Sequence, residues 1–102
     1  MVRRAPLDDY IVETLLPDLT GHDRSPSSFI VFVKLWHDAG GAGRRIQISL
    51  STLAVETGLS KSSVQNAVRQ LKQRRQLIAV THDGPTSPPV YEVLTPWVRA
   101  AG

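Results

Sequence analysis

The chain has 102 residues, of which 41% are hydrophobic and 21% are charged, and it contains no cysteine. A chain of this length can bury one small core, and without thiols it cannot form disulfides, use thiol catalysis or bind a metal through cysteine. No apolar run approaches the roughly 20 residues of a membrane span, and the first residues lack the apolar stretch of a secretion signal. We therefore expect a single domain over residues 1–102 in the cytoplasm of a bacterial cell.

The net charge of +3 is distributed unevenly along the chain. Residues 44–75 contain seven basic residues against one acidic residue, whereas the rest of the chain contains five basic residues against eight acidic ones. A basic patch raises the local concentration of polyanions and steers their approach. The charge pattern therefore indicates either a nucleic-acid surface or a solvated helix face that is basic without binding anything.

The first half of the chain predicts two helices. Apolar residues at helical spacing predict a first helix over residues 7–16, which Pro17 should end or kink, with a turn at 20–25. The serine and proline at 25–26 are typical of a helix start, as N-cap and first helical residue. The second helix is apolar on nearly every side, so we expect it to be central, and the glycines within 40–43 should end it.

The second half predicts a strand, two helices and a hairpin. Polar and apolar residues alternate over 45–50, which predicts a short strand. Two serine-capped helices should follow, over 50–57 and 60–75. The β-prone runs 77–81 and 90–94 flank a loop rich in glycine and proline, and they predict a hairpin.

The junction between the last two predicted helices has a recognisable spacing. Ala54 is small where two helices must approach closely, Gly58 can adopt the left-handed conformation that ends a helix, and Val64 follows six residues later. This spacing resembles the helix-turn-helix of DNA-binding proteins. With the strand before it and the hairpin after it, the stretch 25–95 resembles the winged form, as in bacterial transcription regulators and in the DNA-binding modules of plasmid and phage replication initiators. The resemblance implies an α+β fold, mostly helical, with a small antiparallel sheet whose hairpin is the wing.

The helix predicted over 60–75 has two distinct sides. At about 100° per residue, one side carries an apolar stripe that we expect to be buried, formed by Val64, Ala67, Val68 and Leu71. The opposite side carries only hydrogen-bonding side chains and no acidic residue, namely Ser62, Asn66, Arg69, Gln70 and Gln73. Asparagine and glutamine can bind adenine through two hydrogen bonds, and arginine can bind guanine in the same way. We predict that these five residues contact bases in a major groove, the alternative being an ordinary solvated face.

Phosphate contacts are predicted at the helix starts and at the basic residues around them. Backbone N–H groups, hydroxyls and cations at such positions suit phosphate, although capping and dipole-complementing charge are the plainer explanations. The predicted phosphate-binding residues are Ser51, Thr52, Ser60, Lys61, Ser63, Gln65, Lys72, Arg74, Arg75, Arg44 and Arg45.

The predicted wing departs from the common pattern of winged helices. Residues 82–89 contain no lysine or arginine, and they include Asp83. A deep contact of this loop with the minor groove is therefore not expected, although Thr86 or Ser87 could touch one phosphate. We expect the wing mainly to cover the core.

The sequence as a whole predicts sequence-specific binding of double-stranded DNA by a transcription regulator, without enzyme activity, cofactor or metal. Each histidine merely precedes an aspartate, and the glycines at 40–43 lack the lysine and spacing of a P-loop. The alternative is a protein-interaction or replication-initiation module with weak or no DNA binding, which the acidic stretch 8–38 suggests. We expect a homodimer, with the helix 7–16 and the tail 96–102 as candidate contacts, and neither a membrane nor a small-molecule effector as partner.

Overall fold

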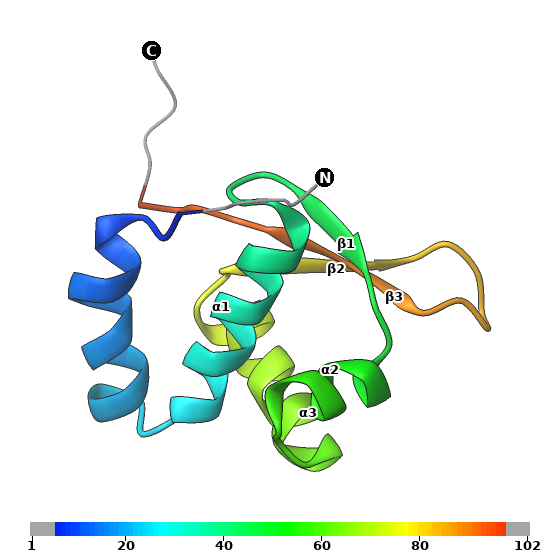
Figure 1. Ribbon diagram of the computed structural model, residues 1–102, viewed down its shortest axis with the longest axis horizontal. Coiled ribbons are helices and arrows are strands. Elements are labelled where there is room, and N and C mark those ends of the chain that lie inside the picture. The colour runs from blue at the N-terminus through cyan, green and yellow to red at the C-terminus, as the bar shows by residue number, and fades with distance from the viewer. Residues whose placement is uncertain (1–5, 98–102) are drawn as a thin grey trace.

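The computed structural model describes residues 6–97, in which helices cover a three-stranded antiparallel sheet (Figure 1). The helical elements are η1 (Ile11–Leu15), η2 (Asp18–His22), α1 (Pro26–Ala39), α2 (Leu50–Thr57), α3 (Lys61–Arg69) and η3 (Gln70–Arg74). The strands are β1 (Arg45–Gln47), β2 (Ile78–His82) and β3 (Pro89–Val93), in the order β1-β3-β2. None of the helices in this part of the chain combines the length and the apolar character needed to cross a membrane.

The sequence predicts that Pro17 ends or kinks the first helix, but the N-terminal segment is helical from Asp9 to His22, so Pro17 does not end it. Pro17 has helical dihedral angles, φ −66° and ψ −31°. The turns on either side of it are π-helical and close through bonds over five residues, such as the 2.8 Å bond from the Asp23 N–H to the Asp18 carbonyl. Proline lacks one N–H, and a segment that already departs from the regular α-helical bonding can accommodate that loss.

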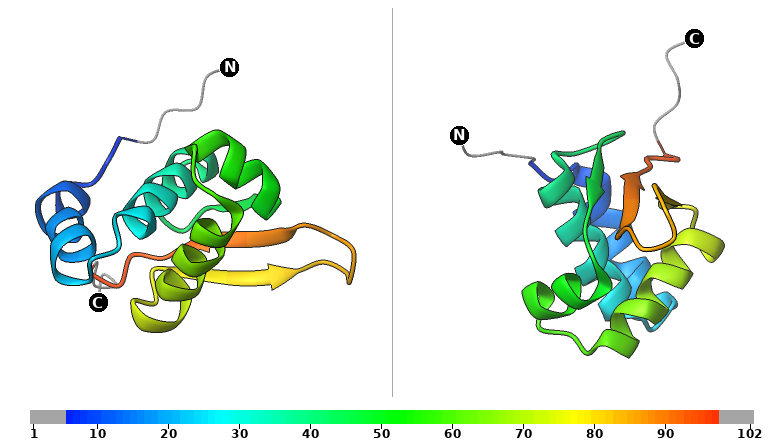
Figure 2. Two further views of the ribbon diagram at one scale, coloured as in Figure 1. Left: turned by 90° about the horizontal axis from the view of Figure 1, so that it is seen from below. Right: turned by 90° about the vertical axis from the view of Figure 1, so that its right-hand side faces the viewer.

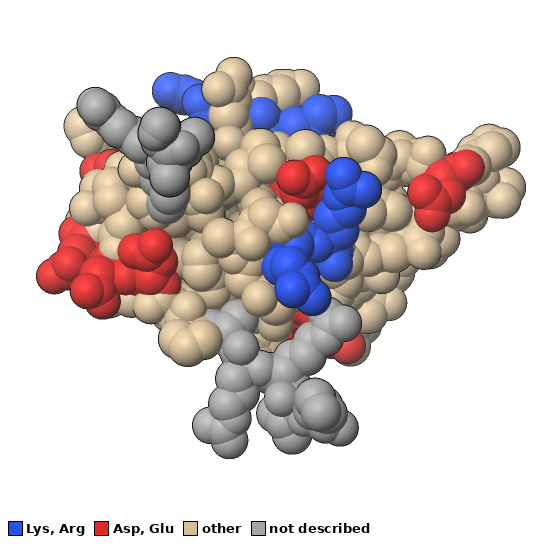
Figure 3. Space-filling model, turned by 90° about the horizontal axis from the view of Figure 1, so that it is seen from above, with Lys and Arg blue, Asp and Glu red and all other residues tan. Residues whose placement is uncertain are grey.

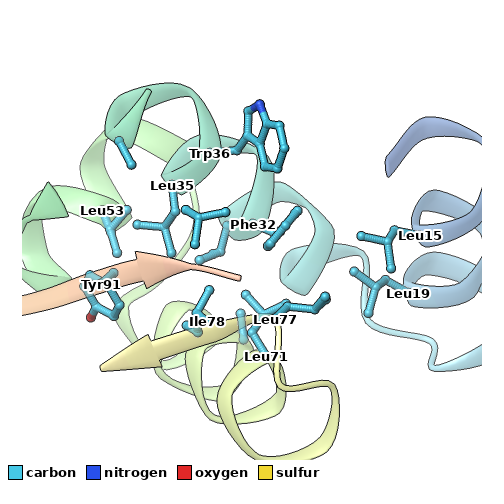
Figure 4. Packing of buried hydrophobic residues seen from close by; sticks show 14 of the residues in the cluster. Leu15, Leu19, Phe32, Leu35, Trp36, Leu53, Leu71, Leu77, Ile78 and Tyr91 are labelled. Atoms are coloured by element: carbon cyan, nitrogen blue, oxygen red, sulfur yellow. The ribbon is translucent and has the colours of Figure 1, made fainter. Parts of the chain in front are cut away.

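Helix α1 lies at the centre of the molecule, as its apolar composition predicts (Figures 1 and 4). It begins at Pro26 and ends at Gly40, whose φ of 99° lies in the left-handed region. The Ser25 hydroxyl does not cap the helix but shares a 2.6 Å hydrogen bond with the hydroxyl of Ser28. Buried side chains from all parts of the chain surround α1, including Leu15, Leu19, Leu53, Leu71, Leu77, Ile78 and Tyr91 (Figure 4).

The helix-turn-helix is formed by α2 and α3, and its local signals are confirmed. The Ser49 hydroxyl accepts a bond from the Thr52 N–H, and α2 ends at Gly58 with φ 78°. The Ser60 hydroxyl then accepts from the Ser63 N–H at 3.1 Å and caps α3. Beyond Arg69 the helix continues as the π-helical turn η3. The helix predicted over 60–75 is therefore a continuous segment with an α-helical and a π-helical part, which we call segment 61–74.

The sheet carries the wing that the resemblance predicts. Strand β3 pairs with both other strands, and Tyr91 faces Ile46 on β1 and Val80 on β2. The loop between β2 and β3, residues 83–88, extends away from the helices (Figures 1 and 2). Gln47 on β1 steadies this wing loop, because its amide donates to the Pro88 carbonyl at 3.1 Å. The predicted fold class, α+β and mostly helical with a small antiparallel sheet, is confirmed.

Candidate nucleic-acid interface

The apolar stripe predicted on segment 61–74 is buried, and the side opposite to it is open. Val64, Ala67 and Leu71 have at most 1% of their surface exposed, and Val68 is partly buried. On the other side four of the predicted base-contacting residues are exposed, namely Ser62, Asn66, Arg69 and Gln73. The segment lies on the lower side of the molecule in Figure 1 and is seen from that side in Figure 2.

Three of the exposed residues form a small array on this face. The Arg69 guanidinium donates to the side-chain oxygen of Asn66 at 3.1 Å, which joins residues one turn apart. Asn66, Arg69 and Gln73 also border one hollow together with Arg74, and Asp23 and Gln70 line the same hollow. Within residues 6–97 Arg69 has no other side-chain partner, so most of its N–H donors point to solvent.

Gln70, the fifth predicted base-contacting residue, is used inside the protein. It is half-buried, and its side-chain oxygen accepts from the hydroxyl of Ser28 at 3.1 Å. Its side-chain nitrogen donates to a carboxylate oxygen of Asp23 at 3.0 Å. Because both ends of this amide are engaged, the structure argues against the predicted base contact, and we leave Gln70 out of the proposals below.

Arg75, a predicted phosphate contact, is engaged by the same carboxylate. Its Nε donates to Asp23 at 2.8 Å, and the two side chains are only 29% and 13% exposed. The hydrogen bond from Arg75 lowers the pKa of Asp23 from its ordinary value, and the same bond raises the pKa of Arg75. We call Asp23, Gln70 and Arg75 the Asp23 cluster, which joins the end of η2 to the end of segment 61–74.

The backbone on both sides of the Asp23 cluster is in an unusual conformation. Arg24 and Gln76 both have φ 53°, and they are the non-glycine residues with positive φ in residues 6–97. Each directly follows one partner of the Asp23–Arg75 ion pair. Left-handed backbone is uncommon for such residues and is kept only where surrounding contacts enforce it. The Asp23 cluster therefore holds the point at which the helical segment ends.

The other predicted phosphate contacts are placed more openly. Arg45 is 71% exposed but pairs with Glu92 across β1 and β3 at 3.4 Å. The Ser60 hydroxyl caps α3, and the hydroxyls of Thr52 and Ser63 accept hydrogen bonds from those of Ser49 and Ser60. The predicted phosphate contacts that are exposed and have no ion pair in the described part of the chain are Arg44, Ser51, Thr52, Ser60, Lys61, Gln65, Lys72 and Arg74.

The positions of the acidic side chains leave the basic surface accessible to a ligand. Glu56 is the one acidic residue within 44–75, and it pairs with Lys34 on α1 at 3.1 Å instead of neutralising a cation of segment 61–74. Figure 3 shows acidic side chains gathered at the end of the molecule that holds the N-terminal helical segment, and others at the wing. No group of three or more histidine, aspartate and glutamate side chains within residues 6–97 could hold a metal ion.

An open groove separates segment 61–74 from the hairpin, and we call it the wing groove. It is lined by Leu50, Gln65, Val68, Arg69, Lys72, Gln73, Val80, His82, Pro89 and Tyr91. The helical wall supplies the two cations, and the hairpin wall supplies one basic side chain, His82. Tyr91 is 1% exposed, and burial raises the pKa of its hydroxyl, so the tyrosine stays neutral.

Sequence reasoning did not select His82 as a site residue, although a signal for it was present. Side chains alternate between the two faces of a strand, so Ile78, Val80 and His82 share one face. Ile78 is buried, which directs that face toward the helices. The alternation in β2 places His82 on the core-facing side of the strand, and the structure shows that this side lies opposite segment 61–74.

The candidate dimer contacts are only partly used within the chain, because Leu7 and Val12 are exposed. The ring of Tyr10 stacks on Trp97 at 4.7 Å between centroids, and Trp97 in turn meets Phe32 edge-on. Ile11 and Leu15 are buried in the core. Residues 98–102 of the predicted tail lie outside the described residues, and the homodimer stays a prediction.

Comparisons with protein-family models, with curated proteins and with solved structures found no match to this chain. The functional argument therefore depends on the geometry and chemistry described above.

Proposed function

We propose that the protein binds double-stranded DNA in a sequence-specific manner by placing α3 in a major groove, and that it regulates transcription in this way. The observation that carries the proposal is the face of segment 61–74 that carries Asn66, Arg69 and Gln73. This face is exposed, contains no acidic residue of the segment, and lies opposite a stripe in which Val64, Ala67 and Leu71 are buried. A major groove admits one helix, and these side-chain types match the hydrogen-bonding edges of adenine and guanine.

The proposed contacts are of two kinds, to bases and to phosphates. Arg69 and Asn66, which already hydrogen bond to each other, are the proposed base contacts. Lys61 at the start of α3 and Lys72 and Arg74 near the other end are proposed to bind phosphates on either side of the groove. Phosphate contacts set position and general affinity, whereas base contacts set specificity. A homodimer would place two such helices on a two-fold symmetric site.

The test begins with selection of bound sequences from a random duplex pool. Fluorescence anisotropy then compares the selected duplex with a scrambled one for the wild type, Arg69→Ala and Lys61→Ala. We expect Arg69→Ala to cost about 1–3 kcal/mol on the selected duplex only. Lys61→Ala, the matched loss of a cation, should weaken both duplexes alike and reduce the salt slope by about 1.

Two outcomes contradict the proposal. If the wild type shifts no duplex at low salt and selection yields no enriched sequence, DNA binding is ruled out. If Arg69→Ala weakens the selected and scrambled duplexes equally, Arg69 contacts phosphate and does not determine specificity.

A second candidate function is a protein-interaction or replication-initiation module. Two observations favour it: the acidic N-terminal end of the molecule, and an open apolar groove between α1 and α2 lined by Phe29, Ile30 and Val33. Val55 on α2 is also 81% exposed. Elution from heparin below physiological salt, together with no gel shift on mixed duplexes, would favour this function over the first.

A further inference from the structure

The wing groove has one basic side chain on its hairpin wall, and that side chain is a histidine. His82 is the last residue of β2 and is exposed. Lys72 and Arg69 stand on the helical wall of the same groove. Within residues 6–97 the His82 imidazole has no hydrogen-bonding or ionic partner, so its ring is available to a ligand entering the groove.

The charged groups around His82 are cations from the helical segment and carboxylates that are engaged elsewhere. Asp83 follows in the chain, and its carboxylate accepts from the Gln47 amide at 3.4 Å. On β3 the residue opposite His82 is Pro89, and Glu92 pairs with Arg45 on β1. None of the residues that line the groove is acidic. A groove with cations on one wall, an imidazole on the other and no carboxylate in its lining is suited to an anion.

We propose that a phosphodiester group of the bound DNA occupies the wing groove and that His82 binds it as imidazolium, so that DNA affinity rises as the pH falls. This inference depends on the proposed function, because the DNA backbone is the anion that α3 would bring to the groove. The wing has no lysine or arginine from residue 82 to 89, and the proposal lets it contact a DNA phosphate through His82 instead.

The physical basis is linkage between proton and phosphate. Histidine titrates near neutral pH, and an opposite charge within a few ångströms favours its charged form. A phosphodiester stays ionised throughout this range, so binding takes up a proton at His82. When binding takes up a proton, lower pH strengthens binding by the same linkage that makes stability depend on pH.

His37 provides a control because it lies elsewhere. It is exposed on α1 and borders the apolar groove with Ile30 and Glu56, on a surface that the proposal does not use. His22 borders another hollow together with Asp18 and Arg74, one of the proposed phosphate contacts, so it is not a matched control. A pH effect that belongs to the wing groove must therefore disappear with His82 and persist without His37.

The test measures the affinity for a mixed-sequence duplex at pH 6 and pH 8 and at one ionic strength, by fluorescence anisotropy of labelled DNA. For the wild type we expect about three- to tenfold tighter binding at pH 6. His82→Gln should bind with the same affinity at both pH values, close to the wild type at pH 8. His82→Lys should bind at both values about as tightly as the wild type at pH 6, and His37→Gln should behave as the wild type. Thermal melts check that each variant is folded.

A second readout follows the imidazole itself. In NMR spectra recorded at pH 6, the imidazole signals of His82 should shift when DNA is added, whereas those of His37 should not.

The outcomes separate this inference from the proposed function. Wild-type affinity that does not depend on pH, or pH dependence that persists in His82→Gln, overturns the role of His82. In either case the proposed function stands, since selection and Arg69→Ala test it separately. Failure of the wild type to bind any duplex at either pH overturns both.

Discussion

Arg69 and Arg75 lie six residues apart on one basic stretch, yet the fold uses them in opposite ways. Arg69 is exposed on the outward face, and among the described residues only Asn66 hydrogen bonds to its side chain. Arg75 is partly buried and is bound to Asp23, which also holds Gln70. The comparison shows that some cations of a basic stretch are free to bind a ligand, whereas others are paired within the protein. Only the free cations, which we call the available part of the stretch, can bind a polyanion.

The largest effect is expected from removing the centre of the Asp23 cluster. Asp23→Ala takes away the acceptor of both Arg75 and Gln70, and a hydrogen bond to a charged group contributes about 1.5–3 kcal/mol. Because both partners of the ion pair are partly solvated, we expect the free energy of unfolding to fall by about 2 kcal/mol. Chemical denaturation measures this change.

Asp9→Ala is the matched control, because Asp9 is exposed on the same N-terminal segment and should change the free energy of unfolding by less than about 0.5 kcal/mol. Asp23→Ala should also bring Arg75 into the available part of the stretch and strengthen binding to mixed duplexes a few-fold. An equal loss of stability in the two variants would mean that the Asp23 cluster does not hold the helical segment.

The pH dependence of the free energy of unfolding should reflect the protonation of the Asp23 carboxylate. The folded protein lowers the pKa of Asp23 below its ordinary value of 3.8, so its contribution is fully present above that value. The contribution is lost as the pH falls from about 4 through the folded-state pKa, since the unfolded chain then binds the proton first. The difference in unfolding free energy between the wild type and Asp23→Asn should therefore be constant from pH 7 to pH 5 and shrink toward pH 3. A difference that grows on acidification would contradict this assignment.

The smallest effects are expected from substituting Gln70 and Gln73. Like Arg75 and Arg69, one of them is hydrogen bonded within the protein and the other is exposed. Gln70→Ala should lower the free energy of unfolding by about 1 kcal/mol, because it removes two hydrogen bonds between segments. Gln73→Ala should leave stability unchanged, because Gln73 is exposed, and should weaken binding to the selected duplex a few-fold. Thermal melts and anisotropy on both variants check the contrast, and the reverse result would assign the two glutamines to the opposite roles.

The helix-turn-helix could be predicted from residues close together in the chain. Ser49 and Ser60 cap α2 and α3, and Gly58 ends α2 at the predicted residue, because capping is decided within one turn. The buried stripe with Val64 and Leu71 followed equally from helical periodicity. The fold class and the open face of the candidate site therefore followed from local signals.

Local signals failed where a residue's partner is distant in the chain or where the helix changes type. Pro17 does not end its helix, since the π-helical turns around it are packed on the core through residues such as Leu19. The α-helical projection is also wrong for Gln70, where the helix becomes π-helical and a turn holds an extra residue, although it is right for Leu71 and Gln73.

Helical periodicity gave Arg69, Gln70 and Gln73 one common role, and their charge and hydrogen-bonding capacity are properties of the residues themselves. Which of these side chains remains available was set by Asp23, which lies 47 residues before Gln70 and 52 before Arg75. A hydrogen bond over such a separation depends on how α1 and η2 are packed against segment 61–74. Periodic patterns describe residues close together in the chain and therefore cannot predict it.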